Sequence, residues 1–152
     1  MDMVFSSAQG VADAVGARLG ESDWLEIDQE RIDRFAEATG DFQWIHVDPE
    51  RAREGPFGST VAHGYLTFSL VNMFLPQLFR VEGMKMGINY GANRLRFPAP
   101  VPVGSRVRAV AELVEAELRE DNAVQTTIRV TMEVEGSAKP GCVADIIGRY
   151  YF

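Results

Sequence analysis

In the stretch 124-VQTTIRVTMEVEG-136, mostly apolar residues alternate with polar ones. Apolar residues and one threonine occupy the even positions from Val124 to Val134, and polar or charged residues occupy most of the odd positions between them. A period of two is typical of a β-strand that buries one face and leaves the other in water. The stretch therefore predicts a sheet with one wet face.

Three further strands are predicted around this one, and short turns separate them. The weaker alternation of 105-SRVRAVAELVEAELR-119 comes before it, and 120-EDNA-123 is a plausible hairpin connection. The segment 137-SAKPG-141 leads into 142-CVADIIGRYYF-152, and another strand is predicted over 86-MGINYGANRLRF-97, ended by 98-PAPVPVG-104. No helical crossover separates these strands, so we expect an antiparallel sheet.

Helices are predicted before the strands. Residues 28–40 carry a capping aspartate at the start and a glycine at the end, and 48-DPERARE-54 has the same kind of cap followed by proline. A longer helix is predicted from Ser59 or Thr60 to about Leu75, apolar on most sides and therefore buried, with Pro76 ending or kinking it. The predicted class is α+β, an antiparallel sheet around one long central helix.

The length, net charge and cysteine count of the chain exclude several classes of protein. The 152 residues are most simply one domain, 1–152, and a net charge of −7 argues against nucleic-acid binding. Cys142 is alone, which predicts no disulfide and a reducing, cytoplasmic setting. We see no secretory signal at the N-terminus, and the run from Val61 to Phe79 is too polar to span a bilayer.

The segment 39-TGDFQWIHVDP-49 holds an acid and a base between two predicted helices. Residues five apart face different sides of a helix or a strand, so only an irregular turn brings Asp41 and His46 together. Such a pair can perform general acid/base chemistry on water. The alternative is an aspartate that bends the loop and a histidine near the surface. A metal site is not expected, because no third ligand lies at recognisable spacing.

The segment 59-STVAHGYLTFSLV-71 holds the second histidine and a glycine in the first turn of the predicted central helix. Gly64 allows two readings. Its bare N–H could donate to a carbonyl oxygen that gains charge during a reaction, or the missing side chain could make room for packing. His63 is expected to be structural.

These residues resemble the MaoC-like (R)-specific enoyl-CoA hydratases, or hydratase 2. The resemblance lies in 36-AEATGDFQWIHVDPERA-52, 62-AHGYLTFSL-70 and 97-FPAPVPVG-104, and covers roughly residues 24 to 151. The chain is particularly similar to the single-domain branch that includes actinobacterial 3-hydroxyacyl-thioester dehydratases and nodulation protein N. Two positions depart from the family pattern: Gln43-Trp44 replaces Asn-Pro, and Asn72 replaces a serine.

The resemblance implies a hot-dog fold and a homodimer, with no cofactor and no metal. It also implies Asp41 and His46 as a catalytic dyad and Gly64 as the oxyanion-hole donor to the thioester carbonyl. The expected reaction is reversible hydration of trans-2-enoyl thioesters carried by CoA or acyl carrier protein. Asp41 is favoured as the base and His46 as the proton donor. Gln43, Tyr65 and Asn72 are the expected substrate-binding residues.

The remaining assignments are broader. Tyr65, Phe68 and Met73 are candidates for lining an acyl slot, and the candidates for binding CoA phosphates are Lys85, Arg94, Arg96, Arg106 and Arg108. Two rival functions are a hot-dog acyl-CoA thioesterase and a non-catalytic acyl-thioester binding module. Thioesterases of this fold typically place a carboxylate on the central helix, and 60-TVAHGYLTFSLVNMF-74 contains neither Asp nor Glu.

Overall fold

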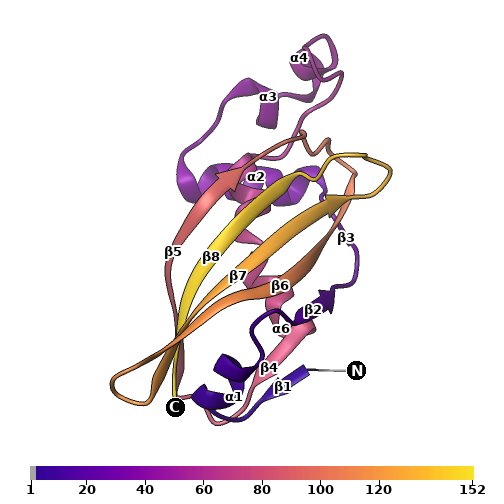
Figure 1. Cartoon of the computed structure of the whole chain (residues 1–152). Helices are drawn as coiled ribbons and strands as arrows, with labels where there is room; N and C mark the ends of the chain where they lie inside the picture. The colour runs from indigo at the N-terminus through magenta and orange to yellow at the C-terminus, as the bar shows by residue number, and fades with distance from the viewer. Residues whose placement is uncertain (1–2) are drawn as a thin grey trace.

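A long antiparallel sheet curls around a central helical segment in the computed structural model, which describes residues 3–152 (Figure 1). The main sheet has the strand order β2-β6-β7-β8-β5, and β3 also pairs with β6. Its strands are β2 (Arg18–Glu21), β3 (Leu25–Glu26), β5 (Met86–Arg96), β6 (Arg106–Arg119), β7 (Ala123–Val134) and β8 (Cys142–Tyr151). The expected hot-dog arrangement, a sheet wrapped around a helix, is confirmed.

The four long strands follow the predicted ranges closely. In β7 every even position is buried and most odd positions are half-buried, as the period of two predicts. The turn between β6 and β7 places Asp121 at φ 62° and Asn122 at φ 54°. Asp and Asn tolerate this left-handed region better than most residues, so the hairpin prediction is confirmed with its physical cause.

The two shorter predicted helices are also confirmed. In α2 (Gln29–Thr39) the Asp28 side chain accepts from the Arg31 N–H, and Gly40 ends the helix at φ 79°. In α4 (Pro49–Arg53) the Asp48 side chain accepts from the Arg51 N–H. One element was missed between them: the expected loop contains a single helical turn, α3 (Trp44–Val47).

The prediction for the central helix was wrong in three respects. It begins at Gly64, because the preceding backbone donors are used in extended pairing: Val61 N–H donates to Ile45 O and Ala62 N–H to Val101 O. It consists of two segments, α5 (Gly64–Ser69) and α6 (Val71–Leu78), and Pro76 lies inside α6. It is also not buried on all sides, since the Tyr65 side chain is 66% exposed.

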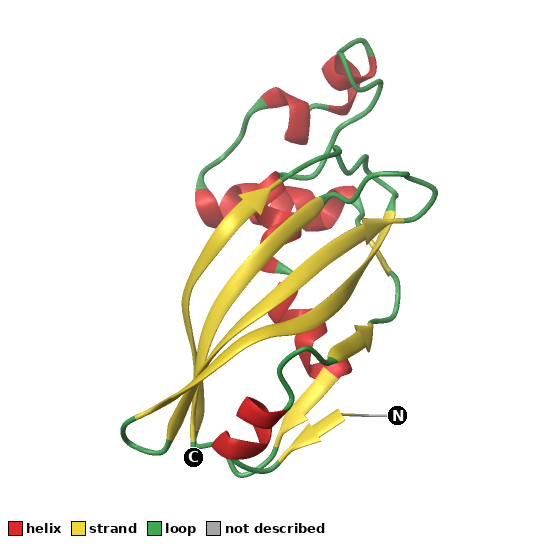
Figure 2. Cartoon of the chain, in the orientation of Figure 1, coloured by secondary structure: helices red, strands yellow, loops and turns green. Residues whose placement is uncertain are grey.

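The N-terminal elements had no strong sequence signal because they are short. β1 (Met3–Phe5) pairs in parallel with β4 (Phe79–Val81), and α1 (Ala8–Asp13) covers one end of β6 and β7. Figure 2 shows these pieces beside the end of the sheet where the C-terminus lies.

One hydrophobic core joins the helices to the concave face of the sheet. Phe74 from α6, Ile32 from α2 and Met132 from β7 are almost fully buried members of it. Burial of side chains of this size stabilises the fold by roughly 1.5–3 kcal/mol each. None of the helices within residues 3–152 has the length and apolar character needed to cross a membrane.

Candidate active site

Residues 40–63, which we call the overhang, project beyond the end of the sheet and carry α3 and α4 (Figure 1). Trp44 joins these two helices. Its ring lies under the Arg51 guanidinium, 4.3 Å from the ring centroid, and a side chain at Gly55 would meet the ring at 2.9 Å. The departure from the family's proline thus has a packing role, because Trp44 fixes α3 against α4.

His46 lies on α3, and only 7% of its surface is exposed. Its Nδ1 is 2.6 Å from Val61 O. A carbonyl oxygen only accepts, so Nδ1 carries the proton and the neutral ring has a free lone pair at Nε2. The Gln29 amide also donates to His46 O at 2.7 Å, which ties α3 to α2. Burial lowers the pKa of His46 from 6.5, against smaller opposing effects from Val61 O and Asp41.

Asp41 follows Gly40 on the exposed side of the overhang, and its side chain accepts from the Gln43 N–H at 3.3 Å. This contact bends the loop, which agrees with the alternative interpretation of Asp41 as a residue that shapes the turn. The carboxylate nevertheless lies close to both histidines: one ligand-capable atom from each of Asp41, His46 and His63 lies within 4.8 Å of the other two. The turn therefore brings the acid and the base together.

His63 is buried against His46. It is 3% exposed, and its ring stacks on His46 with centroids 3.9 Å apart and planes 23° apart. Its Nε2 lies 3.0 Å from the backbone oxygen of Asp41. The separation of 17 residues from His46 gave no signal in sequence, because backbone pairing of Val61 with Ile45 and the contacts His46–Val61 and His63–Asp41 bring the two segments together in the fold.

Asp41, His46 and His63 bring three groups of the kind that bind metals close together, and His63 is the third candidate ligand that no sequence spacing indicated. Lone pairs of an imidazole lie in the ring plane. The rings stack with centroids 3.9 Å apart and planes only 23° apart, so the two planes do not meet within the roughly 2 Å that separates a metal from a ligating nitrogen. The stacked rings therefore do not fit a shared metal ion.

Gly64 is the first residue of α5, directly after His63. A Cβ at this position would meet the Phe97 ring at 3.0 Å. Close packing is thus one reason for the glycine, and it does not occupy the N–H, which lies in the first helical turn where donors have no partner within the helix.

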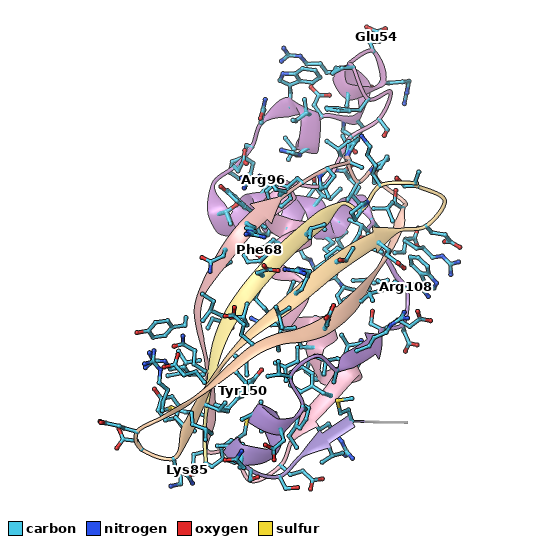
Figure 3. All side chains as sticks on the ribbon, in the orientation of Figure 1. Glu54, Phe68, Lys85, Arg96, Arg108 and Tyr150 are labelled. Carbon is cyan, nitrogen blue, oxygen red and sulfur yellow. The ribbon has the colours of Figure 1, made fainter. Side chains whose placement is uncertain are left out.

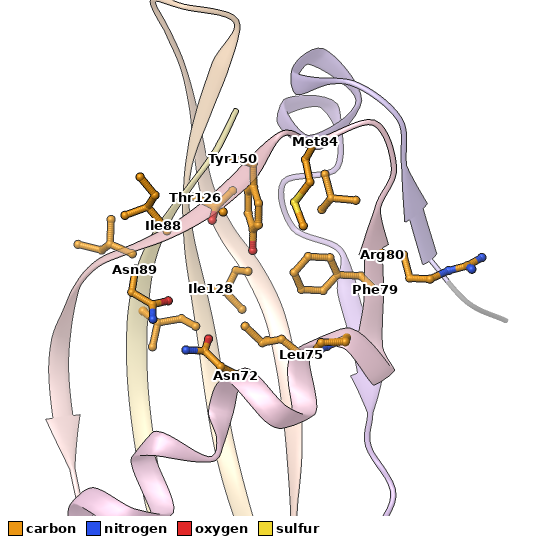
Figure 4. A pocket seen from close by; sticks show the side chains of 16 residues that line it. Asn72, Leu75, Phe79, Arg80, Met84, Ile88, Asn89, Thr126, Ile128 and Tyr150 are labelled. Atoms are coloured by element: carbon orange, nitrogen blue, oxygen red, sulfur yellow. The ribbon is translucent and has the colours of Figure 1, made fainter. Parts of the chain in front are cut away.

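The other predicted site residues are divided between two places. Gln43 is exposed on the overhang, and Tyr65 is exposed with its ring edge-on to Phe97, 5.8 Å between centroids. Asn72 lines a different feature, a cavity of about 460 Å³ that we call the α6 cavity (Figure 4). The Phe68 and Met73 side chains do not line it.

The α6 cavity lies between α6, β5 and β8, and most of its lining is apolar. Leu75, Phe79 and Ile128 form part of its wall, and Tyr150 points its hydroxyl into it (Figure 4). Burial raises the pKa of Tyr150 to about 12, so the phenol stays neutral. No member of the Asp41, His46 and His63 cluster lines this cavity.

The candidate cations for phosphate binding also separate into two groups. Arg106 pairs with Glu135, and Arg108 pairs with Glu133 and Glu21. Arg108 extends from β6 away from the core (Figure 3). Among residues 3–152, Lys85, Arg94 and Arg96 make no ion pair with a carboxylate.

The fold and the site together define a class: a hot-dog protein with an acid and a neutral histidine beside the start of its central helix. The MaoC-like domain model matches residues 10–135, so the chain belongs to the MaoC-like domain family.

Its relatives agree with this assignment. The chain is 56% identical to 3-hydroxyacyl-thioester dehydratase Z of Mycobacterium tuberculosis over 146 residues, which cover 96% of this chain and 97% of the relative. It is 45% identical to nodulation protein N of Rhizobium leguminosarum bv. viciae, covering 93% and 89%. The branch expected from the sequence is confirmed.

Solved structures agree as well. The monoamine oxidase regulatory protein of Archaeoglobus fulgius superposes with a TM-score of 0.80 at 22% identity, covering 100% of this chain and 99% of the other. The (R)-hydratase of A. caviae involved in PHA biosynthesis superposes with a TM-score of 0.68 at 26% identity, covering 88% and 94%.

Proposed function

We propose that this chain is an (R)-specific enoyl-thioester hydratase that also works in reverse as a 3-hydroxyacyl-thioester dehydratase. The dehydratase relative at 56% identity and the (R)-hydratase structure support the reaction class. The observation that carries the proposal is the meeting of Asp41 with a buried His46 whose Nε2 is free to accept a proton.

Hydration begins when the two groups hold one water molecule over C3 of the substrate. His46 Nε2 takes a proton from the water as its oxygen bonds to C3, and the C2=C3 electrons move toward the thioester carbonyl. His46 then returns this proton to C2, which restores both the enzyme and the carbonyl. Asp41 accepts a hydrogen bond from the second O–H of the water, whose hydrogen stays on the new C3 hydroxyl, and stabilises the transient imidazolium.

This assignment reverses the roles that the sequence favoured for the dyad. The bond from His46 Nδ1–H to Val61 O leaves the neutral ring only a lone pair at Nε2. The lowered pKa of His46 also supports a neutral resting imidazole, which is a base rather than a proton donor.

Gly64 supplies the proposed oxyanion donor. Its N–H belongs to the first residue of α5 and directly follows His63, whose ring stacks on His46. A single donor of this kind contributes about 10²–10³-fold to a rate.

The acyl tail is proposed to enter the α6 cavity, with Asn72 at its lining. Asn72 is eight residues beyond Gly64, roughly 12 Å at the rise of an α-helix. This separation favours substrates with a tail well beyond C3. The exposed Tyr65 and Gln43 are left as contacts for the thioester end or its carrier.

The carrier is CoA or an acyl carrier protein, and both present a phosphate. Arg94 and Arg96 on β5 are the proposed contacts, since Phe97, the next residue, packs on Gly64. Arg106 and Arg108 are less suitable because their guanidinium groups already pair with glutamates.

We also propose one domain spanning 1–152 that pairs with a second copy. β5 ends the sheet and is exposed along almost its whole length, with Ile88 42% and Tyr90 59% exposed. An edge strand with apolar side chains is a ready partner for an identical edge.

The test is an assay of purified protein with crotonyl-CoA and longer trans-2-enoyl-CoAs. We expect loss of the enoyl absorbance and formation of the (R)-3-hydroxyacyl product by chiral analysis. Free CoA released from a saturated acyl-CoA, without hydration of any enoyl-CoA, would instead identify a thioesterase. Binding without turnover across all chain lengths would identify a binding module.

A further inference from the structure

His63 contacts both members of the proposed dyad. Its ring lies between Phe35, with centroids 4.9 Å apart, and His46, with centroids 3.9 Å apart. Its Nε2 faces the backbone oxygen of Asp41 at 3.0 Å, and because that oxygen only accepts, Nε2 carries the proton. One side chain therefore touches the ring of one dyad member and the backbone of the other.

The other ring nitrogen of His63 is left without a partner. Nδ1 is buried and makes no hydrogen bond within residues 3–152. A phenylalanine would stack on His46 equally well without burying an unpaired polar atom, so stacking alone does not account for the imidazole. The distinct property of the imidazole is its Nε2–H, which a phenyl ring lacks.

His63 also connects the dyad to the proposed oxyanion donor. It is the residue before Gly64, and its carbonyl accepts from the Leu66 and Thr67 N–H groups at the start of α5. The helix start, the Asp41 backbone and the His46 ring therefore all contact one residue, the first through its backbone and the other two through its side chain.

We propose that His63 is a positioning residue, which holds the Asp41 backbone through Nε2–H and fixes the His46 ring by stacking. The role rests on the proposed hydratase function. A shift of about 1 Å in a catalytic group can lower the rate on the order of 10²-fold, so contacts that fix both dyad members in place should raise the rate.

A second consequence concerns the charge of His46. The titratable groups that act on it are Asp41, on the α2–α3 connection, and His63, at the start of α5. A neighbouring imidazole opposes protonation of His46, and the carboxylate favours it. Loss of the His63 ring should therefore move the His46 titration to higher pH.

Two substitutions separate the two contacts. His63→Phe keeps an aromatic face for His46 but removes the donor to Asp41 O, whereas His63→Gln keeps an N–H donor of similar reach and removes the ring. We expect each to lower kcat by about 10- to 100-fold with KM nearly unchanged. Thr67→Val, a buried neighbour on α5, is the matched control and should keep the wild-type kcat.

NMR gives a readout that does not depend on activity, because the chain has only two histidines. In either His63 variant the single remaining imidazole signal belongs to His46, and we expect it to titrate at higher pH than in the wild type. An unchanged His46 titration together with an unchanged kcat per folded molecule would overturn the proposal. A wild-type protein inactive on every enoyl-CoA would instead refute the hydratase function, and the NMR titration would still test the contact.

Discussion

The overhang and the α6 cavity lie toward opposite ends of the central helical segment, and they differ in chemistry. The overhang buries two stacked imidazoles beside a carboxylate, whereas the cavity is lined mainly by apolar side chains and one neutral phenol. The first arrangement can move protons and the second can hold a hydrocarbon chain. Under the proposed function, the reaction depends on the overhang and the choice of substrate depends on the α6 cavity.

The largest effect is expected from changes to the dyad. Asp41→Asn or His46→Gln should lower kcat by about 10²–10⁴-fold on every enoyl-CoA, because each removes a group that we propose binds the reacting water. Glu54→Gln, on the exposed end of α4, is the control carboxylate in the same segment and should leave the rate unchanged. Steady-state kinetics on folded variants measures this, and full activity of both dyad variants would remove the overhang from the reaction.

A change in the cavity should act on chain length instead. A Cβ at Gly148 would meet only ordinary contacts, 3.6 Å from Ile88 O and 3.8 Å from Thr126 Oγ1, so Gly148→Val should fold while narrowing the cavity. Each methylene that loses its site costs about 0.8 kcal/mol, so two excluded methylenes should lower kcat/KM for long substrates by about 10-fold.

The same variant should treat crotonyl-CoA as the wild type does, because that substrate has almost no tail. A chain-length series of kcat/KM measures the contrast. An equal loss at all lengths would mean that the cavity is not the tail site.

The pH dependence should be a property of the overhang alone. His46 must be neutral to accept a proton, and burial lowers its pKa below 6.5. We therefore expect kcat/KM to fall on the acid side with a midpoint below pH 6.5, in the wild type and in Gly148→Val alike. An acid limb centred above pH 6.5 would contradict a buried His46 as the base.

The smallest effect is expected on stability. Because the folded pKa of His46 is lowered, the unfolded chain binds a proton more readily, and stability present above pH 6.5 is lost as the pH falls toward the folded pKa. The slope from one such group is at most about 1.4 kcal/mol per pH unit. Urea unfolding of the wild type and of His46→Gln should differ in this slope between pH 6.5 and the lower pKa, and equal slopes would refute the shift.

Much of this arrangement could be predicted from local patterns. The long strands follow from alternation, and α2 and α4 follow from their caps at Asp28 and Asp48. The start of the central helix could not be predicted, because it depends on long-range pairing of Val61 with Ile45 and with Pro102. The local helix propensity of a segment carries no information about such long-range pairing.

For the candidate site too, local contacts could be predicted from sequence and long-range contacts could not. Asp41 and His46 are close in sequence, so their meeting follows from a turn between two capped helices. His63 reaches them only through the folded overhang, and the α6 cavity is lined by residues of α6, β4, β5, β7 and β8, which are far apart in sequence. The proposal that His46 is the base also rests on a hydrogen bond to Val61 O that no sequence pattern indicates.

The central claim is that Asp41 and His46 act as one unit on one water molecule. A double-mutant cycle of kcat with Asp41→Asn, His46→Gln and their combination tests it most directly. Groups that act as a unit are strongly non-additive, so we predict that the double variant is about as slow as the slower single variant. If the two losses multiplied, the groups would act independently and the proposed mechanism would be wrong.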